Sequence, residues 1–362
     1  AYSAALERIT QSYPDDLDGR AFYALSLLGL TGDVRDTRNY MRAAAVAEEI
    51  YEVNKRHPGA LHYMIHAYDD PIHAPLGLRA ARLYSKIAPA ASHAQHMPSH
   101  IFFALGMWDE GIASNKDSLH TAHQQGSSGY HPLHWLQYAH LQKGHLDEAK
   151  KLMDLIESDV ADEATPYGRV HLAMMRATWL VETGYAPLPK SREPVERGRE
   201  KLIGPFAGHH MALGMAALKE GDQEGAGDAL SSLRALIEGG KAVRTSETAG
   251  SRLDTVSAEE LASAEIMELQ LQSAIQLAAG NRDEALKLID RAAILEDVAV
   301  FEYGPPATVK PPYEQYGEML LAAGRNEEAA AKFEHALSRY PNRRLSVEGL
   351  NRANSSGQTA SR

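Results

Sequence analysis

The sequence predicts an all-α protein built from repeated pairs of helices. Apolar residues recur three and four positions apart, as in Leu136, Ala139 and again in Leu271, Ile275, a spacing that places them on one face of a helix. Alternating runs of β-branched residues, typical of strands, are absent from the sequence. Gly and Pro stand between the periodic stretches, where they end helices.

One short motif recurs at the turns and predicts where each helix pair bends. It reads GMWDEGI from Gly106, GHLDEAK from Gly144, GDQEGA from Gly221, GNRDEAL from Gly280 and GRNEEAA from Gly324. In each copy, a Gly can adopt the left-handed conformation that ends the first helix. A small residue near the start of the second helix lets the paired helices approach closely.

This pattern resembles the tetratricopeptide repeat, a helix–turn–helix unit of about 34 residues. The resemblance implies a right-handed α-solenoid (superhelix) of about eight helix pairs, with Pro ending several second helices, as in Tyr340-Pro341. We expect each first helix to be followed by a second one. The first helices are predicted near residues 17–31, 60–70, 93–106, 131–144, 169–184, 207–221, 260–280 and 312–324.

The register of the repeats predicts the organisation of the chain. Residues 1–344 form a single array, in which residues 1–15 align with 328–342 and are therefore the second helix of a truncated repeat. Half a repeat cannot bury its apolar stripe alone, so we expect an upstream helix or domain, or self-association through the exposed repeat ends. The polar, Gly-rich residues 239–258 predict a long loop or hinge, and residues 345–362 a frayed tail.

Composition excludes several classes of protein. The 362 residues carry 37 basic and 48 acidic side chains, a net charge of −11, which argues against nucleic acid as the main partner. No apolar run reaches the length of a membrane span, and we expect a soluble protein whose compartment the sequence leaves open. The absence of Cys excludes thiolate metal sites and Cys nucleophiles. The sequence holds no phosphate-binding loop, so no nucleotide cofactor is expected.

Histidine is the unusual residue of this sequence. Sixteen of the 17 His lie between residues 57 and 210. Counted in the repeat register, they recur at positions 2, 5 and 9 of neighbouring first helices, which share one helix face. The tetratricopeptide resemblance implies that these positions line a concave groove. The three stripes are His62 and His66; His93, His96 and His100; and His131 and His134.

These stripes predict a transition-metal site. We expect His62, His66, His96 and His100 to be the ligands of a divalent ion, and imidazole without thiolate suits Zn, Cu, Ni, Fe or Mn. The alternates are His93, His131 and His134. Asp69 and Asp70, which end one His-bearing helix, are candidates for a ligand, a catalytic base or a carboxylate that orients a ligating His. The alternative for every one of these residues is an ordinary capping or packing role.

Longer segments sharpen the resemblance. HYMIHAYDDP, HMPSHIF and FEYGPPATVKP are similar to segments of a His-rich, mostly uncharacterised group of bacterial tetratricopeptide-repeat proteins. This implies the repeat fold, a longer N-terminus and a single site formed by the first two segments. It implies no particular reaction.

Two functions are compatible with this sequence. The first is a metal-binding groove, either non-catalytic or the site of a metal-dependent hydrolase or oxidoreductase acting on a small or peptide-like ligand. The second is a non-catalytic scaffold that binds a peptide or protein partner through polar contacts of its groove histidines. Further groove positions expected to contact a ligand are Tyr138, His171, Lys310 and Glu314.

Overall fold

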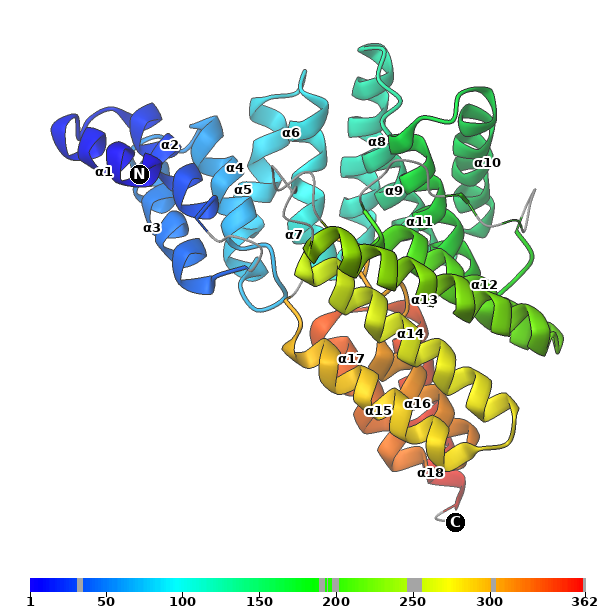
Figure 1. Cartoon of the computed structure of the whole chain (residues 1–362). Coiled ribbons are helices and arrows are strands. Elements are labelled where there is room, and N and C mark those ends of the chain that lie inside the picture. The colour runs from blue at the N-terminus through cyan, green and yellow to red at the C-terminus, as the bar shows by residue number, and fades with distance from the viewer. Residues whose placement is uncertain are drawn as a thin grey trace. The chain divides into compact units, whose positions relative to one another are not determined.

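The computed structural model describes residues 1–30, 35–188, 193, 195–196, 202–245, 256–300 and 304–360. Throughout these residues the chain is helical, with turns and loops between the helices and no strand. It divides into two compact units (Figure 1). Unit 1 comprises Ala1–Ala139 with Val300–Gly304, and unit 2 comprises His140–Ala299 with Pro305–Arg362. The all-α class and the helix-pair repeat predicted from the sequence are confirmed.

Unit 1 is a succession of helices, in which each of α1 to α8 packs on its neighbours in the chain. Its apolar core lies between first and second helices of adjacent pairs, where Leu61, Met64, Met97 and Ile101 are fully buried. Its helices are α1 (Tyr2–Ser12), α2 (Leu17–Leu28), α3 (Thr37–Val53), α4 (Pro58–Ala67), α5 (Ala74–Ile87), α6 (Ser92–His96), α7 (Pro98–Ala104), α8 (Trp108–Gln124) and the first part of α9 (Tyr130–Gln142).

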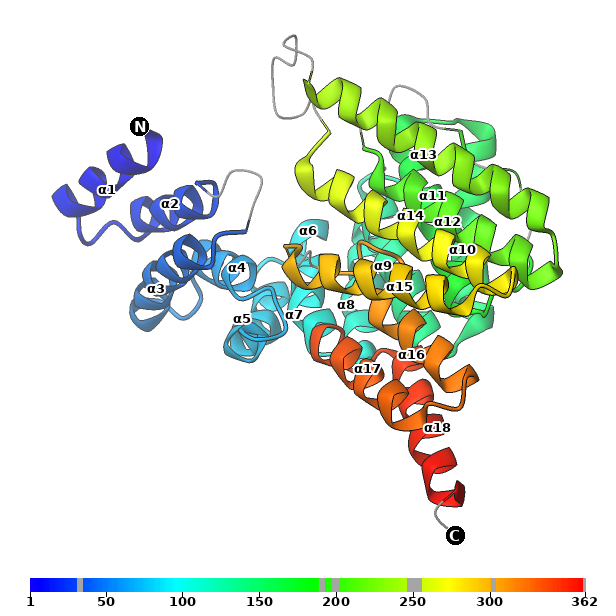
Figure 2. The same ribbon diagram turned by 60° about the horizontal axis from the view of Figure 1, so that its bottom comes forward.

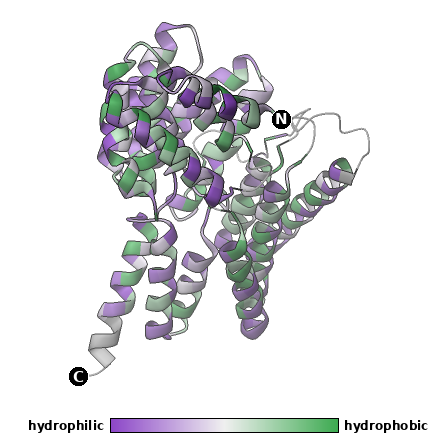
Figure 3. Cartoon of the chain, turned by 90° about the vertical axis from the view of Figure 1, so that its left-hand side faces the viewer, coloured by the Kyte–Doolittle hydropathy of each residue, from purple (hydrophilic) through white to green (hydrophobic). Residues whose placement is uncertain are grey.

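Unit 2 continues the same construction with longer helices. Figure 2 shows α14 beside α15 and α16 beside α17, pairs that are in direct contact. Polar and apolar residues alternate around each helix rather than forming wholly apolar helices (Figure 3). The further helices of unit 2 are α10 (Leu146–Asp162), α11 (Pro166–Glu182), α12 (Gly204–Glu220), α13 (Gln223–Thr245), α14 (Ala258–Ala278), α15 (Arg282–Val298), α16 (Pro312–Ala322), α17 (Asn326–Arg339) and α18 (Arg344–Ala360).

Local sequence explains where the helices begin. His57 precedes α4, and its Nδ1 accepts a hydrogen bond from the backbone N–H of Ala60 at 3.2 Å, while Pro58 occupies the first helical position. A Pro there loses no hydrogen bond, because the first N–H groups of a helix have no intrahelical acceptor. Ser257 and Glu260 form a reciprocal capping box at the start of α14, which satisfies two such donors.

The predicted turn glycines have the expected backbone conformation. Their φ angles are positive at Gly106 (64°), Gly144 (70°), Gly221 (82°), Gly280 (85°) and Gly324 (74°). Close packing of the second helix is clearest at Gly111, where an added Cβ would lie 2.6 Å from the ring of Phe103. The turn motif therefore fixes both the bend and the spacing of α7 and α8.

The predicted first helix at 93–106 is interrupted, which corrects the sequence analysis. The chain forms α6 and α7 with a break at Met97. Pro98 has no N–H to donate, and its ring conflicts with the carbonyl four residues earlier in a continuous helix. The other predicted first helices are observed within a few residues of their expected bounds. A second helix after α11 is not found in the described residues between 183 and 203.

Two segments expected to lack structure are helical. Residues 239–245 extend α13, and Gly240 is needed there for close packing, since an added Cβ would lie 2.9 Å from Ile203. Residues 246–255 of the predicted loop lie outside the described residues. The expected tail is instead the helix α18. Its small residues Ser346, Gly349 and Ala353 are buried, and Gly349 and Ala353 pack against Phe333.

A buried network of charges joins three helices of unit 2. Arg343, which is 0% exposed, pairs with Glu182 at the end of α11 (2.6 Å) and with Glu314 of α16 (2.8 Å). Lys310 pairs with the same Glu314 at 3.1 Å, and Ser346 of α18 donates to it at 2.6 Å. Burial opposes ionisation of Glu314, but Arg343 and Lys310 lower its pKa to about 2.

Among the described residues, we find no helix whose length and apolar character would allow it to span a bilayer.

The Arg343 network predicts a large loss of stability on breaking it. Arg343→Met leaves two buried carboxylates without their shared cation and should lower the free energy of unfolding by about 3–5 kcal/mol. Chemical unfolding followed by circular dichroism measures this change. Arg352→Met, which removes an exposed arginine of α18, the helix that follows Arg343, is the control and should change stability by less than about 0.5 kcal/mol. Equal effects of the two changes would contradict the assignment.

Buried His209 of α12 predicts acid sensitivity of unit 2. Burial, with Arg176 nearby, lowers the pKa of His209 from 6.5 to about 3. Below pH 6.5 the unfolded chain therefore binds a proton that the folded chain cannot, and stability falls as the pH decreases towards 3. His209→Gln should abolish up to about 3 kcal/mol of the stability lost between pH 7 and pH 4.5. The exposed-residue change His145→Gln is the control, and identical acid sensitivity of wild type and His209→Gln would contradict the prediction.

Candidate metal centre

Six histidines of unit 1 gather into two groups of three. His62, His66 and His93 form the outer triad, and His96, His100 and His131 form the inner triad; within each triad, one ring nitrogen per residue lies within 4.8 Å of the others. The residues come from α4, α6, α7 and α9, which are first helices of successive pairs. The outer triad is partly open, since His93 is exposed, whereas His96 and His100 are buried.

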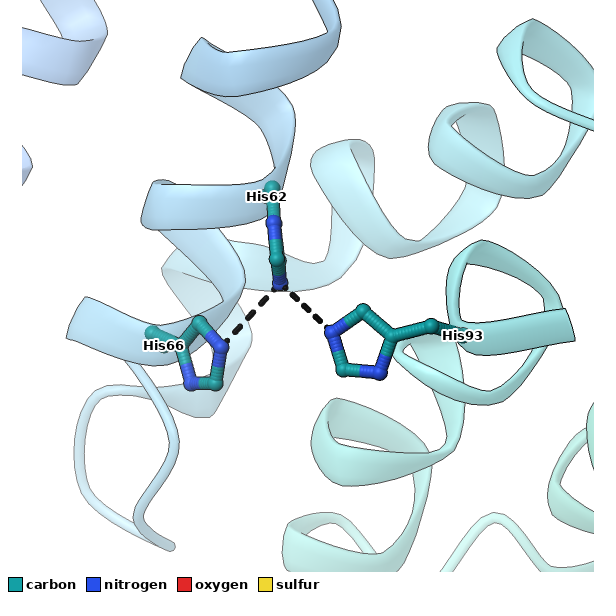
Figure 4. A group of neighbouring side chains, drawn as sticks. All are labelled: His62, His66 and His93. Carbon is teal, nitrogen blue, oxygen red and sulfur yellow. Dashed lines mark hydrogen bonds between the residues drawn. The ribbon is translucent and has the colours of Figure 1, made fainter. Parts of the chain in front are cut away.

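In the outer triad, His62 lies between its two partners (Figure 4). Its Nε2 is 3.1 Å from Nε2 of His66, one helical turn later on α4, and 3.1 Å from Nε2 of His93 on α6. The ring of His62 stacks on Tyr84, with centroids 5.3 Å apart. Three imidazoles therefore turn the same ring nitrogen towards one point.

In the inner triad, Asn115 of α8 fixes the tautomer of His96. The Nδ2 group of Asn115 donates to the carbonyl of Gly111 at 2.9 Å, so Oδ1 is the atom that faces His96. Nδ1 of His96 donates to this Oδ1 at 2.7 Å, and the lone pair of His96 consequently lies at Nε2. This nitrogen is 3.2 Å from Nε2 of His100.

Asp69 contacts His100 on the side of the ring away from His96. Its Oδ2 lies 2.5 Å from Nδ1 of His100, and the carboxylate is 1% exposed. Burial raises the pKa of Asp69 well above its usual value, an effect that Arg35 opposes. A carboxylate hydrogen-bonded to the ring nitrogen that does not bind the metal commonly orients a metal-ligating histidine. Of the three roles that the sequence analysis left open for Asp69, this contact has the geometry of a carboxylate that orients a histidine.

An aromatic cluster packs against the inner triad. The ring of Trp135 lies 4.7 Å from that of His96 and 4.6 Å from that of His100, measured between centroids. His131 contacts His96 edge-on at 4.5 Å. Packing of this kind locks rotamers, which is what a preorganised ligand set requires.

Burial keeps these imidazoles neutral at physiological pH. It is the largest cause lowering the pKa of His62 and His66 to about 3 and that of His131 to about 4, with smaller contributions from neighbouring histidines. The pKa values of His96 and His100 are also shifted well below 6.5. Neutral imidazole is the form that binds metals.

The structure groups the predicted ligands differently from the sequence analysis. His62 and His66 lie in one triad and His96 and His100 in the other, and each pair is completed by an expected alternate, His93 or His131. The reason is that the histidine at position 2 of one repeat, His93 or His131, lies beside the histidines at positions 5 and 9 of the repeat before it. His134 is buried and belongs to neither triad.

Asp70 stabilises the turn after α4 and belongs to neither triad. Its carboxylate pairs with Arg35 at 2.9 Å and with Nδ1 of His73 at 2.8 Å. It also accepts hydrogen bonds from the backbone N–H groups of Ile72 and His73. These contacts explain Asp70 as a turn residue.

The other expected ligand contacts also lie elsewhere. Tyr138 is buried against Phe103 and Trp108, and His171 packs on Tyr167 in unit 2. Lys310 and Glu314 do not line an accessible groove. They are buried in the ion-pair network around Arg343, where each charge is paired with an opposite one. A pocket of about 270 Å³ in unit 2 is lined by other residues, including Tyr185 and His210.

Asn115 is the functional residue that the sequence analysis missed. Its signal was present, since it falls on the buried face of α8 with Gly111, Ser118 and Ala122. An amide on a buried helix face needs a buried partner, and that partner is His96.

The spacing of the ring nitrogens fits metal coordination. Four ligands placed tetrahedrally at about 2.0–2.1 Å from a zinc ion are separated from one another by about 3.3–3.4 Å. The Nε2–Nε2 contacts His62–His66, His62–His93 and His96–His100 are 3.1–3.2 Å, and the remaining ligand nitrogens of each triad lie within 4.8 Å of one another. Three protein ligands leave further coordination positions for water or a substrate, as in catalytic metal sites.

No family model and no curated protein matches this chain. Among solved structures, it is similar to the human IFIT1 dimer with m7Gppp-AAAA, at 14% identity and a TM-score of 0.45, covering 100% of this chain and 77% of that one. It is also similar to yeast Tom70, at 11% and 0.39 (99% and 58%), and to the APC/C hetero-tetramer Cut9–Hcn1, at 12% and 0.39 (97% and 58%). Similarity at these identities and TM-scores indicates no partner and no activity for this chain.

Asn115 predicts a stability effect that does not depend on metal. In the metal-free protein, Asn115→Leu should lower the free energy of unfolding by about 1–3 kcal/mol, because buried Nδ1 of His96 loses its acceptor. Chemical unfolding in the presence of a chelator measures it. The exposed change Asn54→Leu is the control, and a loss no greater than that of the control would show that the hydrogen bond does not orient His96.

Proposed function

We propose that unit 1 binds a divalent transition metal ion through His96, His100 and His131. The observation that carries this proposal is the contact between Nε2 of His96 and Nε2 of His100 at 3.2 Å. Since Asn115 places a lone pair on His96 at this point, a proton or a metal ion must lie between the two nitrogens. A metal ion satisfies both, together with His131.

The ligand chemistry supports the same proposal. The triad contains imidazole alone, the chain has no Cys, and the carboxylate of Asp69 stands behind His100 rather than in the triad. Zinc, copper and nickel bind such sites, with copper the tightest of the divalent ions. Solvent reaches the half-buried His131, so an additional coordination position can hold water or substrate. This arrangement suits hydrolysis or oxidation at the metal.

Metal content tests the proposal. Tag-free protein loaded with Zn²⁺ or Cu²⁺ and then desalted should retain metal, measured by elemental analysis. The double change His96→Gln with His131→Gln should lower the affinity of this site by at least 100-fold, since two of three ligands are lost. The matched control His120→Gln with His123→Gln removes two exposed histidines of α8 and should leave binding unchanged.

The outcomes separate the two functions raised by the sequence. Retained metal that is reduced in the inner-triad variant and unchanged in the control supports a metal centre. Less than about 0.1 ion per chain in the loaded wild type, or equal loss in both double variants, would reject the centre and favour a peptide-binding scaffold. Circular dichroism of all three proteins confirms that they are folded.

A further inference from the structure

The two triads have the same arrangement of histidines, and the second lies one repeat after the first. In each, two histidines four residues apart are joined by the first histidine of the next repeat. The first two lie on α4 in the outer triad, and on α6 and α7 in the inner triad. His62 and His96 are 34 residues apart, as are His66 and His100. In the following repeat, His134 is followed four residues later by Tyr138, so the series ends after two complete triads.

The triads are also neighbours in space. The rings of His66 and His100, one from each triad, lie 5.9 Å apart between centroids. Both triads belong to unit 1, and His93 and His96 stand one helical turn apart on α6. A ligand triad of the same composition therefore lies beside the proposed site, and it opens to solvent through His93.

We infer that the outer triad holds a second ion and that the two triads form a dinuclear copper centre with dioxygen as its ligand. This inference rests on the proposed function of the inner triad. It identifies the metal, the number of ions and the substrate class, which is molecular oxygen.

Charge is the reason for copper. Neither triad contains an anionic ligand, and the carboxyl group of Asp69 beside His100 could balance at most one of the four positive charges of two divalent ions. Two such ions side by side would therefore repel one another. Two Cu⁺ ions carry half that charge, and imidazole is a suitable ligand for copper. On oxygenation each Cu⁺ gives one electron to O₂, which becomes a peroxide dianion bound between two Cu²⁺ ions. The peroxide supplies the missing negative charge, and the step consumes no proton and no other reductant.

The structure accounts for a difference between the two ions. The inner ligands are buried and held by Asn115 and Asp69, whereas His93 of the outer triad is exposed. Preorganised, supported ligands bind more tightly, so the inner ion should be the last to leave during chelation. Dioxygen, being small and apolar, needs only the partly open outer triad for access.

Anaerobic titration with Cu⁺ against a competing chelator tests the stoichiometry. The wild type should bind two ions per chain, and His62→Gln with His93→Gln should bind one. One ion in the wild type would overturn this inference and leave the proposed function standing. No bound ion would overturn both. His120→Gln with His123→Gln is the matched control and should bind two.

Admission of O₂ to the Cu⁺-loaded protein tests the coupling. The wild type should develop a new near-ultraviolet charge-transfer absorption and give no electron paramagnetic resonance signal, because the two Cu²⁺ spins pair through the bridging ligand. The outer-triad variant should lack the absorption and, once oxidised, show the signal of an isolated Cu²⁺ ion. Two independent Cu²⁺ signals in the wild type, without the absorption, would overturn the inference.

Discussion

The hydrogen bond from Nδ1 of His96 to Asn115 is the interaction on which the site depends. It fixes one tautomer of His96 in a buried place, and Asp69 contacts Nδ1 of His100 one helical turn later. Because Nδ1 of each ring is in contact with Asn115 or Asp69, the Nε2 atoms of His96 and His100 face one another. The cost of leaving such groups unpaired in the core is large, and this cost holds the rings in place without a metal.

The repeat architecture supplies the rest of the geometry. Each turn glycine sets the angle between a first and a second helix, and small residues such as Gly111 bring α8 close enough for Asn115 to reach His96. Pro98 interrupts the helix between the two ligands, yet their Nε2 atoms are only 3.2 Å apart. The ligands of the inner triad thus come from α6, α7 and α9, with Asn115 on α8, rather than from a loop, which favours precise placement.

Much of this architecture was predictable from the sequence, because helix periodicity and turn glycines are local signals. The six histidines were also found, since their repeat positions share a helix face. The division into two triads was not predictable, because it depends on how position 2 of one helix faces positions 5 and 9 of the previous one. Residues 345–360 were misjudged because their buried stripe consists of small residues, and Lys310 because its partners Glu314 and Glu318 enclose it only after folding.

X-ray absorption spectroscopy of the protein loaded with one equivalent of Zn²⁺ tests the central claim most directly. The account predicts a first shell dominated by nitrogen at about 2.0–2.1 Å, with the outer-shell scattering of about three imidazole rings. A shell of oxygen ligands with fewer than two imidazoles would contradict it, because the histidine triads would then not be the site of metal binding.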